Sequence, residues 1–197
     1  HILMTCGPAI LVGDEIFESN LEGPAYNTYR ATYDETVEYI CSELETAAAY
    51  LPLKASIAQF ERPTKGAAYA LIARLRLHAA SPLFNGTSTA RLYFGNWKRT
   101  YDKEYYVNQN YSEEKWALAA AACKRVIDMN VYELFTVSKD QNTPQLPAGV
   151  PTENFPDGAG GIDPFKSYSY MFTGDEPFKN NNEIIWGRIS EEVKGYT

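Results

Sequence analysis

Three stretches of the chain place apolar residues three and four positions apart, which is the spacing of one face of an α-helix. The first predicted helix begins at Thr32, where Thr32 and Glu35 fit a capping box, and it ends before Pro52. The second follows Thr64, and the third follows Ser112, whose next two residues are glutamates that favour the positive end of a helix. The apolar faces consist of Val37, Ile40, Cys41, Leu44, Ala47, Ala48 and Leu51 in the first helix, Ala67, Ala70, Leu71, Leu75 and Leu77 in the second, and Trp116, Ala119, Ala120, Cys123, Val126 and Ile127 in the third.

Alanine is frequent in the first two predicted helices. Small side chains let two helix axes approach closely, so we expect residues 34–50 and 64–80 to form an antiparallel helical hairpin. The predicted fold class is therefore mainly α, with irregular helical hairpins, long aromatic-rich loops and little strand.

The connections between the predicted helices are long and rich in aromatic residues. Residues 83–111 and 130–182 are weakly periodic and contain turn signals such as Asn85-Gly86. Connections of this length are usually either functional or disordered, and their aromatic content argues against disorder. Residues 182–189 form a β-prone or short buried run.

The charge balance excludes one class of partner. The chain has 25 acidic and 18 basic residues, a net charge of −7, which repels the phosphates of nucleic acids. Cys6, Cys41 and Cys123 are scattered without metal-binding spacing, so we expect no metal site and place Cys41 and Cys123 in the core. No apolar run is long enough to span a bilayer, and we expect no cofactor.

One segment carries a longer motif. Residues 62–82 read R-P-T-K-G-A-A-Y-A-L-I-A-R-L-R-L-H-A-A-S-P, which resembles the SusD/RagB pattern R-x-T-K-G-A-A-x-A-L-x-A-R-x-x-L-x-A-A-S-P. Residues 30–52, 116–134 and 182–186 resemble further segments of that family in the same order, and the last of them reads N-E-I-I-W. The resemblance to the SusD/RagB family therefore covers most of the chain.

The resemblance implies a fold, a location and a function. SusD/RagB proteins have irregular TPR-like helix pairs that support a glycan platform. They are lipid-anchored on the extracellular face of the outer membrane, where they cover a SusC-type TonB-dependent transporter. Because family members are longer, we expect residues 1–197 to form a single partial SusD/RagB-like domain without the lipid anchor, which would be its only contact with a membrane.

The function implied by the resemblance is non-catalytic binding of an oligo- or polysaccharide at the cell surface, for delivery to the transporter during nutrient uptake. The alternative is a TPR-like interaction scaffold whose groove takes a protein in place of a sugar. Glycan and transporter are the expected partners in the first case.

The loops supply the chemistry that a sugar needs, namely exposed rings for its apolar faces and amides or carboxylates for its hydroxyls. Trp97 is the preferred ring, because the polar and small residues around it predict exposure. The competing interpretation is packing, since Tyr168, Tyr170 and Phe172 alternate as on the buried face of a short strand. Trp116 and Trp186 are expected in the core. The predicted glycan-binding residues are Asn96, Trp97, Tyr101, Tyr105, Tyr168, Tyr170 and Asp175.

The sequence offers little for catalysis. His78 lies on an alanine-rich helix, where a structural hydrogen bond explains it, and no hydrolase or metalloprotease motif is present. A glycoside hydrolase needs two carboxylates about 5–10 Å apart, and loop acids such as Asp157, Asp163 and Asp175 are its only support. We expect no enzymatic activity, and we expect Asp157 and Asp163 to lie in a solvated loop and not at a calcium site.

Overall fold

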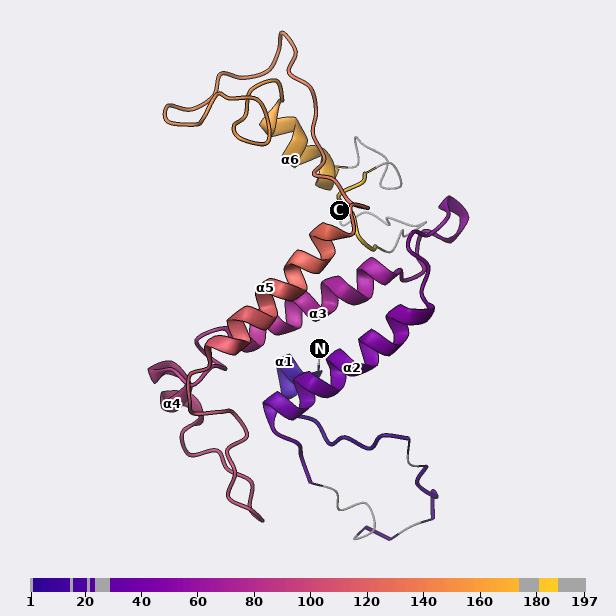
Figure 1. Cartoon of the computed structure of the whole chain (residues 1–197), viewed down its shortest axis with the longest axis vertical. Helices are drawn as coiled ribbons and strands as arrows, with labels where there is room; N and C mark the ends of the chain where they lie inside the picture. Colours follow the sequence, from indigo (N-terminus) through magenta and orange to yellow (C-terminus); the bar gives the residue numbers. More distant parts are fainter. Residues whose placement is uncertain (1, 15, 21, 24–28, 174–180, 188–197) are drawn as a thin grey trace, which may run out of the picture. The chain divides into compact units, whose positions relative to one another are not determined.

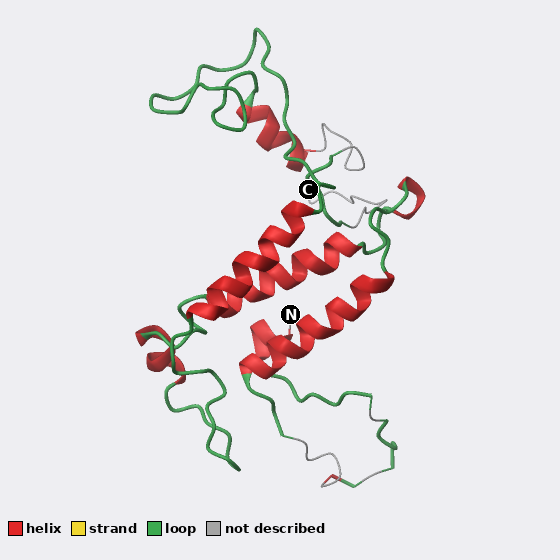
Figure 2. Cartoon of the chain, in the orientation of Figure 1, coloured by secondary structure: helices red, strands yellow, loops and turns green. Residues whose placement is uncertain are grey.

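The computed structural model of the chain describes residues 2–14, 16–20, 22–23, 29–173 and 181–187. It is mainly helical, and Figure 2 shows helices joined by loops. The described part holds no strand, and its β-bridges are isolated pairs. This confirms the predicted fold class. The helices are α1 (Ile2–Cys6), α2 (Tyr33–Tyr50), α3 (Lys65–Ala80), α4 (Ser88–Phe94), α5 (Glu113–Asp128) and α6 (Pro164–Thr173), with a 3₁₀ turn at Ile57–Gln59.

The chain divides into two compact units. The first comprises residues 1–51 and 68–128, and the second comprises residues 52–67 and 129–197. The single domain expected over residues 1–197 stays a prediction. Of the described helices, none is both long and apolar enough to cross a membrane.

Helix α2 begins and ends as the sequence predicts. The Thr32 hydroxyl accepts a hydrogen bond from the Glu35 N–H (3.1 Å), and the Glu35 carboxylate accepts one from the Thr32 N–H (2.6 Å). These two bonds complete the capping box and satisfy donors that the first helical turn leaves free. At the other end Leu51 is extended (φ −79°, ψ 144°), the conformation that a residue before proline favours.

Helices α2 and α3 form the predicted antiparallel hairpin (Figure 1). The Tyr33 hydroxyl at the start of α2 lies 3.1 Å from His78 Nδ1 at the end of α3, which gives His78 the expected structural role. Tyr33 also stacks on Phe84, with ring centroids 4.3 Å apart and planes 7° apart. The core around this contact consists of Leu3, Tyr33, Val37, Cys41, Ile72, Ala79 and Val107.

Helix α5 packs through alanines. Ala119 is buried and Ala122 packs against the core. The predicted core face of this helix is wrong in part, because Trp116, Ala120 and Ile127 are exposed. Small residues let α5 approach its neighbours closely, and the contact centred on Ala119 and Ala122 turns the larger side chains Trp116 and Ile127 outward.

Three ion pairs join α2 to α3 and α5, and in each of them the acid lies on α2 and the base on α3 or α5. Lys115 contacts Asp34 (2.6 Å), Arg76 contacts Glu38, and Arg125 contacts Glu45. Arg125 also lies over the ring of Tyr69, 3.7 Å from its centroid. The charges of α2 are therefore complementary to those of the surface against which it packs.

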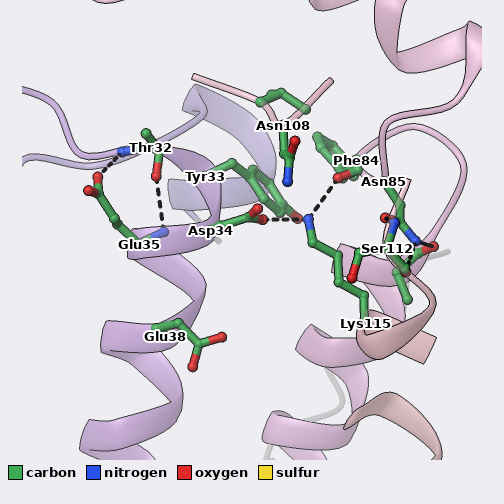
Figure 3. A network of polar contacts seen from close by, with 12 residues as sticks. Thr32, Tyr33, Asp34, Glu35, Glu38, Phe84, Asn85, Asn108, Ser112 and Lys115 are labelled. Atoms are coloured by element: carbon green, nitrogen blue, oxygen red, sulfur yellow. Dashed lines mark hydrogen bonds and ion pairs between the residues drawn. The ribbon is translucent and has the colours of Figure 1, made fainter. Parts of the chain in front are cut away.

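A buried amide ties the turn between α3 and α4 to Ser112, the residue before α5, as Figure 3 shows. Asn85 is fully buried; its side-chain N–H donates to Ser112 O (2.9 Å) and its oxygen accepts from Ser112 N–H (2.9 Å). The adjacent Gly86 has φ 58°, and a β-carbon there would collide with the backbone of Asn110. Asn85-Gly86 is therefore the turn that the sequence indicated, and its geometry requires glycine.

The second unit brings the start of α3 against the segment after α5. The Tyr132 ring lies over Gly66, where a β-carbon would be 2.7 Å from Tyr132 Cε2, and its hydroxyl lies 3.4 Å from Thr64 Oγ1. Glu133 N–H donates to Asn182 O (3.3 Å), which ties in the region that the sequence marks as β-prone. Glycine at position 66 thus leaves room for the ring.

Residues 182–187 form turns and not a strand, and residues 188–189 lie outside the described part. Trp186, expected in the core, is 52% exposed, and its indole N–H donates to Glu61 O (2.8 Å). Both expectations are wrong for the same reason. Among the described residues this segment has no neighbouring strand with which to pair, so its backbone forms turns and its Trp186 side chain bonds to the turn at Glu61.

Helices α1, α4 and α6 were not among the predicted helices. α4 has seven residues and α1 has five, fewer than two helical turns, so a three- and four-residue period cannot repeat in them. Capping gives the only local signal for α4: the Thr87 hydroxyl accepts from Ala90 N–H (3.5 Å).

Candidate functional site

Residues 97–106 of the first unit form a short hairpin. The Tyr106 N–H donates to Trp97 O (3.1 Å), and the Arg99 N–H donates to Glu104 O (2.7 Å). A third bond, from the Tyr33 N–H to Tyr106 O (2.7 Å), fixes the base of this hairpin to the start of α2. The loop predicted to carry ligand-binding residues is therefore held in one conformation by backbone bonds.

The tip of the hairpin is turned by local polar contacts. Lys103 has a positive φ of 65°, and Asp102 accepts a hydrogen bond from the Glu104 N–H (3.0 Å). An aspartate that bonds to the backbone two residues later makes an Asx turn. The side chain of Asp102 is therefore placed by the turn itself.

Arg99 is the centre of the hairpin. It is only 7% exposed, and its guanidinium contacts Asp102 through two bonds (3.1 and 2.7 Å), Glu35 (3.2 Å) and Glu104. Burial alone would lower the pKa of Arg99, but the hydrogen bond to Asp102 and the charge of Glu104 raise it. The buried guanidinium of Arg99 thus links residues within the hairpin to one another, and it links the hairpin to Glu35, the capping residue of α2.

Two of the acids around Arg99, Glu35 and Asp102, stay ionised at neutral pH. Burial acts to raise the pKa of Asp102, but hydrogen bonds from the Glu104 N–H and from Arg99 lower it overall. The pKa of Glu35 is lowered first by the bond from the Thr32 N–H, and then by the Thr32 hydroxyl and Arg99, against an opposing effect of burial. Ionised carboxylates accept hydrogen bonds and donate none, so this rim is rich in acceptors.

Two exposed tyrosines lie beside this polar group. Tyr29 is 59% exposed and Tyr101 is 49% exposed; their ring centroids are 4.1 Å apart and their planes meet at 38°. The guanidinium carbon of Arg99 lies 5.2 Å from the Tyr101 centroid, and Lys98 Nζ lies 4.3 Å from that of Tyr105. Contacts of this kind hold an aromatic ring in place at the surface.

Trp97, the preferred ring, is packed and not freely exposed. Its ring lies between Phe94 and Tyr106, with centroid distances of 5.9 and 4.8 Å, and it covers Gly7. It also packs against the core. The expected exposure is therefore wrong, because an unpredicted helix, α4, supplies the apolar partner Phe94. Whether Trp97 binds a glycan stays a prediction, as it does for its exposed neighbour Asn96.

Tyr168 and Tyr170 lie on helix α6 in the second unit, so the buried strand face considered for them is wrong. Phe165, Tyr168 and Phe172 are all exposed and fall on one helical face, and the Tyr168 and Phe172 centroids are 5.2 Å apart. Tyr170 is half-buried. Phe165 and Tyr168 line an apolar hollow with Leu146, Pro147, Val150, Ala159, Pro164 and Ser169.

Asp163 begins α6 and is not solvated, contrary to expectation. It is fully buried; its carboxylate accepts from the Lys166 N–H (2.9 Å) and the Thr143 hydroxyl (3.0 Å). The bond from the Lys166 N–H, followed by that from Thr143, lowers the pKa of Asp163 against the effect of burial. Its role as a helix cap explains the burial. Asp157 is exposed as expected.

The structure brings together only part of the predicted site. Asn96, Trp97, Tyr101 and Tyr105 share one hairpin, Tyr168 and Tyr170 share a helix of the other unit, and Asp175 lies outside the described residues. In the described part, no group of histidine, cysteine and acidic residues could hold a metal ion.

The sequence interpretation missed Tyr29 and Arg99, whose roles depend on contacts between distant residues. It also missed Phe165, although the i, i+3, i+7 spacing of Phe165, Tyr168 and Phe172 is a readable helical signal.

Comparison with known proteins agrees with the motifs. A SusD-like family model, described as "Starch-binding associating with outer membrane", matches residues 8–77. No curated protein sequence matches the chain. The solved structure of BT4246 is 27% identical with a TM-score of 0.64, and the match covers 92% of this chain and 31% of that one.

Two further solved structures are similar. Selenomethionine BT4246 is 26% identical with a TM-score of 0.59, over 92% of this chain and 30% of that chain. A SusD-like protein (BF3747) from Bacteroides fragilis is 19% identical with a TM-score of 0.51, over 91% of this chain and 22% of that chain, and shows the fold alone. The chain thus spans less than a third of these relatives.

The fold is that of a SusD-like helical protein. The family model over residues 8–77 and the BT4246 structure confirm the predicted resemblance to SusD-like proteins, and the BF3747 structure agrees in fold.

Proposed function

We propose that the chain binds a glycan through Tyr29 and Tyr101, without catalysing a reaction. The observation that carries the proposal is the exposed pair of rings, with centroids 4.1 Å apart, beside the carboxylates of Asp102 and Glu104. A sugar has flat C–H faces that stack on rings and a rim of hydroxyls that donate to carboxylates. The hairpin offers both kinds of partner at one place.

The hairpin is also preorganised for this role. Arg99 is buried beneath the site, and its guanidinium lies beside the Tyr101 ring. A ring that is already held in place loses little conformational freedom when a ligand binds, and this lowers the free-energy cost of binding. The family description, starch binding in association with the outer membrane, makes starch the first glycan to test.

Native electrophoresis in gels that contain starch or another polysaccharide tests the proposal. We expect at least one glycan to retard the chain, and Tyr101→Ala to weaken binding about five-fold, since an aromatic contact of this kind contributes about 1 kcal/mol. The matched control is Tyr93→Ala, because Tyr93 is 68% exposed on α4 and is not part of the hairpin of residues 97–106. Equal retardation of both variants would contradict a role of the hairpin in glycan binding.

The wider role follows from the family and remains a proposal. A SusD-like protein would be held by a lipid anchor on the extracellular face of the outer membrane and would pass its glycan to a SusC-type TonB-dependent transporter. Co-purification of the tagged protein with such a transporter from outer membranes tests the partnership. The same glycan incubated with the protein should release no reducing ends, and their release would contradict non-catalytic binding.

One observation favours the second candidate, a TPR-like protein-interaction scaffold. Helices α2, α3 and α5 together line a groove, whose walls include Glu45 and Arg125 as well as the apolar Leu118. Capture of a single protein partner by the chain, with no retardation by any polysaccharide, would favour this function over glycan binding.

A further inference from the structure

A separate hollow of about 270 Å³ lies in the first unit, away from the hairpin tip. Its walls come from the start of α2, the end of α3 and the start of α5, and Val37, Ala79 and Leu118 give it an apolar floor. Pockets for drug-sized ligands measure about 300–1,000 Å³, so this hollow suits a smaller molecule.

The charges that line the hollow are already paired. Lys115 contacts Asp34 (2.6 Å), and Arg76 contacts Glu38 through both of its terminal nitrogens. A cation that is paired with a carboxylate does not offer a full positive charge to a second anion. The one further charged residue in the lining is the exposed Glu114, which also disfavours anions. The lining therefore suits a neutral ligand.

Hydrogen-bonding capacity is nevertheless left over. The Lys115 ammonium has three N–H groups, and within the described part of the chain it uses two, on Asp34 and on the Phe84 carbonyl (3.1 Å). Asn108 accepts from the Asn110 N–H (2.9 Å) through its oxygen, and its side-chain N–H groups have no partner among the described residues. Figure 3 shows the Asn108 amide and the Lys115 ammonium directed toward the same space beside Asp34.

Ser112 adds a third such group to the lining. Its backbone N–H and C=O bond to Asn85, but its hydroxyl has no partner in the part of the chain that the structure describes. Ammonium, amide and hydroxyl donors thus surround an apolar floor, with the Asp34 carboxylate as an acceptor. This combination matches a small neutral molecule with several hydroxyl groups above an apolar face.

We infer that this hollow is a second binding site, which takes a single neutral sugar ring. The choice of a sugar among neutral polyols rests on the proposed function; the size and charge of the ligand rest on the hollow alone. The site is distinct from the Tyr29–Tyr101 pair, because none of the residues that line it belongs to the hairpin.

Amide-resolved NMR of the chain, titrated with D-glucose, D-galactose and D-mannose, tests the inference. We expect at least one of these sugars to shift the signals of Asn108, Ser112 and Lys115. Ser112→Ala removes one hydroxyl donor and should raise Kd about five-fold, which corresponds to one hydrogen bond of about 1 kcal/mol. The control is Ser88→Ala, an exposed serine at the start of α4 that should leave Kd unchanged.

A second variant guards against indirect effects. Asn108→Asp keeps an oxygen that accepts from the Asn110 N–H but removes the side-chain N–H donors. It should therefore also weaken binding of the sugar while the fold is retained. Absence of shifts at these residues with all three sugars, or equal Kd values for Ser112→Ala and Ser88→Ala, would overturn the inference.

The two proposals fail separately. Retardation by a polysaccharide that depends on Tyr101, combined with no monosaccharide shifts in the hollow, would refute the second site and leave the proposed function intact. Monosaccharide-induced shifts in the hollow without retardation by any polysaccharide would refute the proposed function and leave the second site intact.

Discussion

Replacement of Arg99 by methionine removes the cation that three carboxylates share. Methionine keeps much of the apolar stem but leaves Glu35, Asp102 and Glu104 close together without a counter-charge. Breaking a buried ion pair on one side costs about 3–5 kcal/mol. These carboxylates are 35–56% exposed at their side chains, so water screens part of the loss, and we expect the free energy of unfolding to fall by about 1–3 kcal/mol.

The loss should depend on pH in a defined direction. The folded state lowers the pKa of Glu35 and Asp102, so their contribution is complete above the unfolded values of about 4 and disappears as the pH falls through the folded values. Urea unfolding of wild type and Arg99→Met should therefore differ most near pH 7 and converge in acid.

Arg74→Met is the matched control, because Arg74 is exposed on α3 and has no ion pair among the described residues. A difference below about 0.5 kcal/mol between Arg99→Met and this control at pH 7 would refute the reasoning, since surface substitutions alone reach that size. A difference that is independent of pH would refute the assignment of the loss to the carboxylates.

Three further predictions concern stability. Gly66→Ala should lower the free energy of unfolding by about 1–3 kcal/mol, because the new methyl group meets the ring of Tyr132; a gain in urea stability, as for an unhindered helical alanine, would contradict this contact. Thr32→Ala should cost about 1 kcal/mol in thermal unfolding through loss of the capping box, whereas Thr32→Ser should cost much less. Asp163→Asn should speed amide hydrogen exchange at Lys166, and the wild-type amide should lose its protection as acid titrates the lowered pKa of Asp163; unchanged exchange would exclude the cap.

Local sequence signals predicted the long helices well. α2, α3 and α5 repeat their apolar spacing over 16 to 18 residues, and capping or proline residues mark their ends. Their pairing also followed from composition, because alanine-rich faces permit close approach. Periodicity could not predict which face of α5 is buried. The contact through small residues such as Ala119 decides that face and leaves Trp116 exposed.

The candidate site was less predictable, since burial of a loop residue depends on distant neighbours. Trp97 has polar neighbours in sequence, yet Phe94 and Tyr106 enclose its ring. Tyr101 was predicted, but its partner Tyr29 is 72 residues earlier by numbering and gave no local signal. A ring pair of this kind arises from tertiary structure, not from spacing.

The location of a bound oligosaccharide tests the central claim most directly. A crystal structure of the chain with a fragment of the polysaccharide that retards it should show a sugar ring within about 4 Å of Tyr29 or Tyr101, with hydroxyls bonded to Asp102 or Glu104. A sugar bound elsewhere, with both tyrosine rings free, would contradict the account.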